Sequence, residues 1–402
     1  MWDASTAFFA ELRTGYTTAS RLEVLNDDFD PIEDYTIDNS PVSQKTLTNF
    51  LSDGNIDVDT ERGTRRTAEV TIINPTAEFT PSLKGFQADS PWAGVVYVNR
   101  VIRLSRGVYF GDVPEYIPVG TFLVDNAQVI VERNMSLVVL TLSDMWKKLT
   151  KSILAAPKNF PSDTPYNTII SELVNEAGAD QPLAPVLSDL SARAAEDKKI
   201  DTKITLEEGD SRGERLKEYC TAWDIDAYFD PKGRFITQDR QSPRDKEVVW
   251  HFYSSPDRDG MLVNVSRSFN DDNLYNHVVV IGGTVQNPIR RERKDEDPSS
   301  KFNIQSIGDR VLLIKDDKLT SVNKVLRRLD EEWQMRTKIS ETTECEVICN
   351  PALEGDDVIK LTEENFARVD QTYRLKRFNV PMVTSRMKIQ VADVVDEDAL
   401  YQ

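Results

Sequence analysis

The side chains that most often carry out chemistry are rare in this sequence, which has two His and three Cys among 402 residues. Histidine is the usual general base and the commonest neutral metal ligand, so its scarcity makes most hydrolase and metalloenzyme mechanisms hard to assemble. His277 lies in the run YNHVVV, and no Gly-x-Ser-x-Gly elbow, His-Glu-x-x-His helix or Walker loop accompanies it. The sequence therefore predicts no catalytic, cofactor-binding or metal-ligating residues, and a protein that is not an enzyme.

The three cysteines fit buried positions better than a metal site. Cys345 and Cys349 are four residues apart, which on a strand puts them on one face roughly 13 Å apart, at about 3.3 Å per residue. A zinc ion would need two further ligands, and the histidines, His251 and His277, are distant in sequence. Cys220 falls on the apolar stripe of an expected helix. We predict three buried thiols in a chain that folds in a cytoplasm.

Acidic residues dominate the charge: 67 Asp and Glu against 49 Lys and Arg give a net charge of −18. Nucleic-acid binders need cations that displace condensed counterions, so tight binding of DNA or RNA is disfavoured. The acidic clusters at 26–30 and 295–297 lack the spacing of a calcium loop, and we predict that they are solvated loops. Abundant acids and aromatics leave a glycan-hydrolysing enzyme as an alternative, although no particular carboxylate pair stands out.

The length and the apolar pattern define the class of protein. At roughly 100 to 200 residues per domain, the chain predicts about two to four domains. Hydrophobic residues make up only 39 %, yet 16 Phe, 12 Tyr and 6 Trp argue against disorder. We find no apolar window of about 18 residues and no signal-peptide pattern at the start, and so expect no membrane-spanning segment.

Residues 1–150 predict a short amphipathic helix followed by strands. Phe8, Phe9 and Leu12 have helical spacing, and the helix should end near Gly15. The segments that follow are short, β-branched and bounded by turn residues, which is typical of sandwiches and barrels. The expected strands are 21–25, 55–59, 67–73, 95–104 and the hairpin 121–131 with 135–142.

Residues 151–255 predict a small α+β domain. Thr164 can cap and Pro165 fits the first position of a helix whose apolar residues recur with helical spacing until Gly178. Ser211 and Glu214 form a capping-box pair at the start of a second helix. The segment 225–237 then predicts a hairpin around a Pro-Lys-Gly turn.

Residues 256–402 predict a second β region with an exposed loop at 286–300 and one long helix at 319–338. The remaining strands are expected at 262–265, 277–281, 345–349, 357–361, 372–378 and 385–394. Segment 51–58 is faintly similar to 353–359, and both β regions close with a long strand that ends in Asp. This likeness raises the possibility of a duplicated β-barrel.

Taken in order, several segments resemble the hub proteins at the tip of phage tails, which are similar to the trimeric baseplate hub of contractile phages. Within that family the sequence most resembles minor tail proteins of long-tailed phages that infect actinobacteria. The segments that carry the resemblance span nearly the whole chain: GNIDVD at 54–59, RRTAEVTI at 65–72, VGTFLVD at 119–125, YFDPKGRF at 228–235, DNLYNHVVV at 272–280 and NPALEGDDVI at 350–359.

The resemblance implies a mainly β fold with two tail-tube-like β-barrel domains and a small α+β domain between them. It implies a homotrimer whose six barrels join a six-fold tail tube to a three-fold tip around the DNA exit channel. The implied partners are the chain itself, the distal tail ring or tube, the tape measure, other tip proteins, and genomic DNA that passes without tight binding. The implied location is the tail tip of the virion, after assembly in the host cytoplasm.

Two expectations follow from this family. Three copies would carry a charge of −54, and we expect some of the excess acids to line an axial channel and repel the moving DNA. The chain stops at Gln402 without an appended lysozyme, peptidase or carbohydrate-binding module, so wall hydrolysis is expected from another protein. A receptor-binding or cell-wall-binding tip module is a further alternative, for which Trp92, Tyr97 and Tyr109 could stack on sugars.

Overall fold

The fold is described from a computed structural model of the whole chain. The structure describes residues 1–14, 16–38, 47–48, 51–74, 79–80, 96–132, 135–240, 246–254, 261–283, 286–336, 340–363 and 368–394. Within these ranges the chain is mainly β, as the sequence predicts, with one large sheet and three smaller ones.

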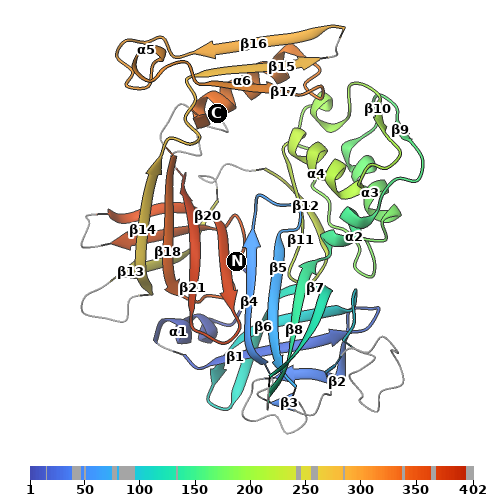
Figure 1. Ribbon diagram of the computed structural model, residues 1–402, viewed down its shortest axis with the longest axis vertical. Helices are drawn as coiled ribbons and strands as arrows, with labels where there is room; N and C mark the ends of the chain where they lie inside the picture. Colours follow the sequence, from blue (N-terminus) through green and yellow to red (C-terminus); the bar gives the residue numbers. More distant parts are fainter. Residues whose placement is uncertain are drawn as a thin grey trace.

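The N-terminal part contributes one helix and eight strands to the large sheet, which Figure 1 shows in blue and cyan. The helix α1 (Thr6–Thr14) buries Phe8 and Leu12, so the predicted amphipathic helix is confirmed. The strands are β1 (Thr18–Leu25), β2 (Pro31–Asp38), β3 (Leu47–Thr48), β4 (Leu51–Asp59), β5 (Arg66–Ile73), β6 (Val101–Phe110), β7 (Val113–Glu132) and β8 (Met135–Asp144).

The C-terminal part adds six strands to the same sheet. They are β13 (Val248–Ser254), β14 (Leu262–Asn270), β18 (Ser340–Ile348), β19 (Val358–Glu363), β20 (Arg368–Pro381) and β21 (Arg386–Asp393). Antiparallel pairing of β20 with β4 joins the two parts into a single 14-stranded sheet. The prediction of two separate closed barrels is therefore not shown, because the described strands form one continuous sheet through this pair.

Alternation of apolar and polar residues places the core under the large sheet. On β4 and β5, Ile56, Val58, Val70 and Ile72 are buried, whereas the residues between them point to the opposite face. Each fully buried aliphatic side chain of this kind contributes roughly 1.5–3 kcal/mol relative to an exposed one. The buried face fixes the register, and the other face of the sheet is free to be polar.

Between the two parts of the large sheet the chain forms an α+β region with its own apolar cluster. Its helices and strands are α2 (Trp146–Lys151), β9 (Lys158–Phe160), α3 (Tyr166–Glu176), the 3-10 helix η1 (Ala195–Lys198), β10 (Ile204–Leu206), α4 (Arg212–Ala222), β11 (Ile225–Phe229) and β12 (Phe235–Asp239). The predicted helix is confirmed as α3, and Gly178 follows it with φ +62°, but the helix begins one residue later than predicted, because Pro165 and not Thr164 is its N-cap. The Ser211 side chain caps α4 by accepting from the amide of Glu214.

A second, three-stranded sheet lies at the top of the view in Figure 1 and forms a small unit with a separate core. It consists of β15 (His277–Gly283), β16 (Pro288–Lys294) and β17 (Val311–Lys315), with α5 (Ile304–Ile307) and α6 (Val322–Arg336). The predicted loop at 286–300 is wrong in its first half, because β16 is an edge strand. The exposed, charged side chains of β16 give it the composition of a loop. Charged side chains are also common on edge strands, where they prevent pairing with other chains. The helix predicted at 319–338 begins three residues later, at Val322, and is described to Arg336; residues 337 and 338 lie outside the described residues.

Two further sequence predictions differ from the structure. The strand expected at 95–104 begins only at Val101, after a turn in which Asn99 has φ +68° and Tyr97 is exposed. The similar segments 51–58 and 353–359 adopt different conformations, since the first is a strand throughout and the second is largely a turn before β19. In the described part of the chain, no helix has the length and apolar character that crossing a bilayer requires.

Candidate functional site

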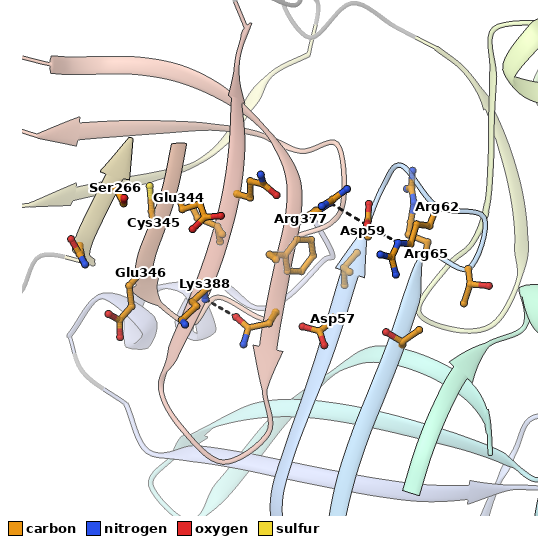
Figure 2. Close-up of a pocket in the computed structure, with 18 residues that line it drawn as sticks. Asp57, Asp59, Arg62, Arg65, Ser266, Glu344, Cys345, Glu346, Arg377 and Lys388 are labelled. Atoms are coloured by element: carbon orange, nitrogen blue, oxygen red, sulfur yellow. Dashed lines mark hydrogen bonds and ion pairs between the residues drawn. The ribbon is translucent and has the colours of Figure 1, made fainter. Parts of the chain in front are cut away.

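A groove of about 720 Å³ lies on the open face of the large sheet. It crosses the seam where β4 pairs with β20, and we call it the seam groove. Strands β4, β5, β14, β18, β20 and β21 all contribute to it. Figure 2 shows side chains from both parts of the sheet along this groove, among them Asp57, Asp59, Arg62, Arg65, Ser266, Glu344, Cys345, Glu346, Arg377 and Lys388.

Strand register explains why polar residues gather there. Across the seam Asp59 lies opposite Arg377, and Asp57 lies opposite Asn379. On the next pair of strands Lys388 lies opposite Glu346. Residues opposite each other share a face, so the positions that alternate with the buried core residues make one polar surface across several strands.

Ion pairs at one end of the groove connect the two parts of the sheet. Arg377 Nε lies 3.1 Å from Asp59 Oδ2, and its Nη2 donates to Glu61 Oε2 at 2.9 Å. Arg62 Nε also approaches Asp59 Oδ2, at 3.0 Å. The Arg62 and Arg377 side chains are 70 % and 47 % exposed. Each ion pair therefore contributes no more than about 1 kcal/mol to the free energy of unfolding.

Amide side chains continue the polar surface in the middle of the groove. The Lys388 amide donates to Asn379 Oδ1 at 2.6 Å, and Asn379 Nδ2 donates to Asn55 Oδ1 at 2.7 Å. Asn55 Nδ2 in turn donates to Asp57 Oδ1 at 2.8 Å. This chain of hydrogen bonds holds the side chains in place on a rigid sheet and leaves a hydrophilic surface.

The charges that line the groove are balanced rather than acidic. The acidic residues are Asp57, Asp59, Glu344 and Glu346, and the basic ones are Arg62, Arg65, Arg377 and Lys388. A surface with close pairs of opposite charge has a weak long-range field. The excess of acids expected on a DNA-facing surface is therefore not concentrated in this groove.

The described residues that line the groove include no histidine and no exposed thiol. Its thiol, Cys345, is only 3 % exposed, and burial raises the pKa of that thiol to about 12. A neutral thiol is a poor nucleophile and a poor metal ligand. Neither histidine lines the groove, and within the described residues no cluster of three or more His, Cys, Asp or Glu could hold a metal ion.

The two histidines lie in separate sheets. His251 on β13 makes a 2.8 Å hydrogen bond between its Nε2 and Thr362 Oγ1 on β19. His277 on β15 is 7 % exposed, and its Nδ1 lies 3.0 Å from Asp309 Oδ1. The structure brings neither ring to a cysteine, and each ring is held by a neighbouring side chain.

All three cysteines are free and buried, which confirms the prediction of buried thiols. Burial raises the pKa of Cys220 to about 12 and that of Cys349 to about 11. The acidic cluster at 26–30 is a turn, in which Asn26 Oδ1 accepts from the amides of Asp28 and Asp30. In the other cluster, Asp297 Oδ1 accepts from the amide of Ser299 at 2.8 Å. Both clusters are exposed turns, as expected.

Two of the three aromatic residues proposed for sugar stacking, Tyr97 and Tyr109, differ in exposure. Tyr109 is 7 % exposed and belongs to the interior, whereas Tyr97 is 43 % exposed near Arg100. Trp92 lies outside the described residues. Of the two described positions only Tyr97 offers a ring to solvent, so Tyr109 is removed as a candidate stacking residue.

Sequence reasoning missed a buried network of charges, which we call the arginine junction and define as Arg65, Arg66, Glu354, Asp356 and Arg374. Asp356 is its centre: Arg65 Nη2 donates to Asp356 Oδ2 at 2.8 Å, and Arg374 Nη1 donates to Oδ1 at 3.1 Å. Burial alone would raise the pKa of Asp356, but the charges of Arg65 and Arg374 outweigh it and hold the pKa below its usual value.

The arginine junction joins the large sheet to the α+β region. The Arg65 guanidinium lies over the Tyr228 ring, 4.0 Å from its centroid. Arg66 pairs with Glu354 and donates from Nη1 to the Phe229 carbonyl at 2.6 Å. Tyr228 and Phe229 belong to β11, so the paired arginines before and at the start of β5 hold three segments together. The Arg-Arg dipeptide was the only sequence signal.

Asp144 lies next to this junction at the end of β8. Its two carboxylate oxygens accept from the amides of Arg66 at 2.9 Å and Trp146 at 3.0 Å. Burial raises the pKa of Asp144 to about 6 despite these hydrogen bonds. The carboxylate links β5 to the start of α2, and its role is structural.

Comparisons with known proteins match this architecture at the level of the fold. No family model matches the sequence, and no curated protein matches it either. The structure superposes on a tail protein from Neisseria meningitidis with a TM-score of 0.66 and 11 % identity, covering 96 % of this chain and 99 % of that one. The chain has the fold of a phage tail protein.

Further solved structures agree with this fold assignment. The 43 kDa tail protein of prophage MuSo2 from Shewanella oneidensis matches with a TM-score of 0.62 and 12 % identity, over 94 % of this chain and 100 % of that one. A VgrG complex matches with a TM-score of 0.56 and 8 % identity, over 96 % of this chain and 66 % of that one. These structures share the fold of this chain.

Proposed function

We propose that the chain is a structural hub of a phage tail tip or baseplate, which joins the six-fold tail tube to a three-fold tip around the DNA exit channel. In this role it forms a homotrimer at the end of the virion tail. Its neighbours are the distal tail ring or tube, the tape measure and other tip proteins.

The observation that carries the proposal is the fold similarity over nearly the whole length of both chains. The tail protein from Neisseria meningitidis is covered to 99 % and the MuSo2 tail protein to 100 %, so no large part of either is missing here. The long β4–β20 seam adds support, because it makes two β regions into one extended wall with a polar open face.

The polar open face suits a wall past which DNA slides. It is built on strands of a continuous sheet, and its paired charges do not attract phosphate strongly. We place this face toward the channel. The chain then needs no tight nucleic-acid contact, which agrees with its net charge of −18.

The proposed domain division is 1–150, 151–255 and 256–402. The apolar clusters group the elements differently: one cluster runs through both parts of the large sheet, a second belongs mainly to the α+β region, and a third belongs to the small unit around α6. The unit formed by β15, β16, β17 and α6 has its own core and is inserted between β14 and β18 of the large sheet.

Antibody labelling of virions that carry this chain tests the proposal. Gold-labelled antibody against the purified chain should bind at the distal end of the tail in electron micrographs. Label on the capsid, along the tail shaft or on side fibres would contradict the proposal. A cell-wall clearing assay with the purified chain is the companion test, and we expect no clearing.

A further inference from the structure

Helix α6 covers one side of the small sheet of β15, β16 and β17, and on the other side the central strand is buried at His277 and Val279 while the edge strand β17 is exposed. Helix α6 packs on the side that carries Val278, Val280, Leu312 and Ile314. On this side the sheet also faces the rest of the molecule, because Arg327 of α6 pairs with Asp224 at 3.0 Å beside α4. The opposite side of the sheet faces away from α6, and we call it the free face.

The free face has apolar residues where a solvated sheet would have polar ones. In the parallel pair of β15 and β17, Val279 lies opposite Leu313 and His277 lies opposite Val311. Val311 is 46 % exposed and Leu313 is 52 % exposed. Parallel strands are usually covered on both faces, so an open parallel pair with two exposed aliphatic side chains indicates a surface that becomes buried in an assembly.

The rim of the free face is basic. Lys315 lies opposite Ile281 on the edge strand β17, and Lys294 lies opposite His277 on the other edge strand, β16. Both lysines are exposed. The other charges on this side are partly paired with each other: Arg290 Nη2 lies 2.5 Å from Glu292 Oε2, and Asp309 holds the His277 ring.

This small unit differs in charge from the rest of the chain. Residues 277–336 contain 12 Lys and Arg against 10 Asp and Glu, a net charge of +2. The remaining residues contain 37 against 57 and carry −20. Two copies of so acidic a chain repel each other in most orientations, and the orientation that sets a basic unit against an acidic surface is favoured.

We propose that the free face is a docking surface for a second copy of this chain, with the apolar residues Val311 and Leu313 at its centre and Lys294 and Lys315 facing the acidic surface of that copy. The contact is heterologous, since two different surfaces meet, and contacts of this kind close into a ring when the rotation allows it. The inference rests on the proposed function, because it names the surface through which the copies of the hub join.

Sedimentation velocity of the purified full chain over a range of concentrations tests the proposal. Leu313→Glu should weaken self-association at least about tenfold, because it puts a carboxylate into the apolar centre and toward an acidic partner. Lys315→Glu should weaken it less, and high salt should remove most of that difference. The matched control is Val113→Glu on β7, where the valine is 70 % exposed and far from this sheet in the chain; it should associate like the wild type.

A second measurement keeps the test independent of any folding defect. All three native thiols are buried, so a dye attaches selectively to Leu313→Cys, and its emission should shift to the blue as the concentration rises. The emission of dye on Val113→Cys should not shift.

If the wild type associates and Leu313→Glu associates equally well, this inference alone is overturned. A wild type that stays monomeric at every concentration would overturn both the inference and the proposed self-assembly. Binding of the wild type to anionic lipid vesicles that Leu313→Glu abolishes would assign the face to a membrane and also overturn it.

Discussion

The seam groove and the arginine junction are built from the same residue types and meet at Arg65, which lines the groove and belongs to the junction, but their ion pairs differ in burial. In the junction Arg65 and Asp356 have side chains that are 3 % and 6 % exposed. In the groove Arg377 and Asp59 are 47 % and 14 % exposed. Water screens the groove pairs, whereas the junction charges depend on each other. The arginine junction therefore stabilises the fold, whereas the seam groove leaves a hydrated surface available for function.

The largest effect is expected from removing the charge at the centre of the arginine junction. Asp356→Asn leaves Arg65 and Arg374 without their buried counter-charge, and we expect a loss of about 3–5 kcal/mol in the free energy of unfolding. Asparagine tolerates the positive φ of +69° at this position, so the change tests charge and not backbone strain. Urea unfolding followed by tryptophan fluorescence measures the loss. A loss below about 1 kcal/mol, which is typical of an exposed pair, would mean that the two regions do not differ in the way described.

An intermediate effect is expected from pH at Asp144. Its folded-state pKa of about 6 lies above the usual value of 3.8, so between these values the folded chain binds a proton that the unfolded chain does not. The free energy of unfolding should therefore fall as the pH rises through this window, by up to roughly 3 kcal/mol for this group. The difference between the wild type and Asp144→Asn, measured by urea unfolding at several pH values, should change across the window. If the curves of unfolding free energy against pH are parallel for the two proteins, the raised pKa of Asp144 is contradicted.

The smallest effect is expected in the seam groove. Asp59→Ala removes the partner of Arg377 and Arg62 on a hydrated surface, and the free energy of unfolding should change by less than about 1 kcal/mol. The change should shrink further in high salt, since salt screens exposed charges. The same urea titration, at low and high salt, measures it. A loss as large as that of Asp356→Asn would show that the groove pairs are structural and would remove the contrast between the two regions.

Local patterns in the sequence predicted local structure well. Apolar spacing with Pro165 and Gly178 predicted α3, and the capping pair Ser211 and Glu214 predicted α4, because caps and helix faces depend on residues close in sequence. The burial of the three cysteines followed from the same reasoning. The predicted absence of a catalytic or metal site stays a prediction, to which the described residues offer no counterexample.

Features that depend on distant residues escaped prediction. The charged strand β16 has the composition of a loop, and only its pairing with β15 makes it a strand. The β4–β20 pair joins segments more than 300 residues apart, and Arg65 meets Asp356 across 291 positions. Many acids could have served as the partner of Arg65, and chain topology alone selects Asp356. For the same reason the seam groove could not be located from the sequence.

A three-dimensional reconstruction of the tail tip that carries this chain tests the central claim most directly. The account predicts three copies around an open axis at the distal end of the tail tube, with the polar face at the β4–β20 seam lining the channel. A reconstruction that places the chain in peripheral fibres, or that turns the seam groove outward to solvent while another surface lines the channel, would contradict it.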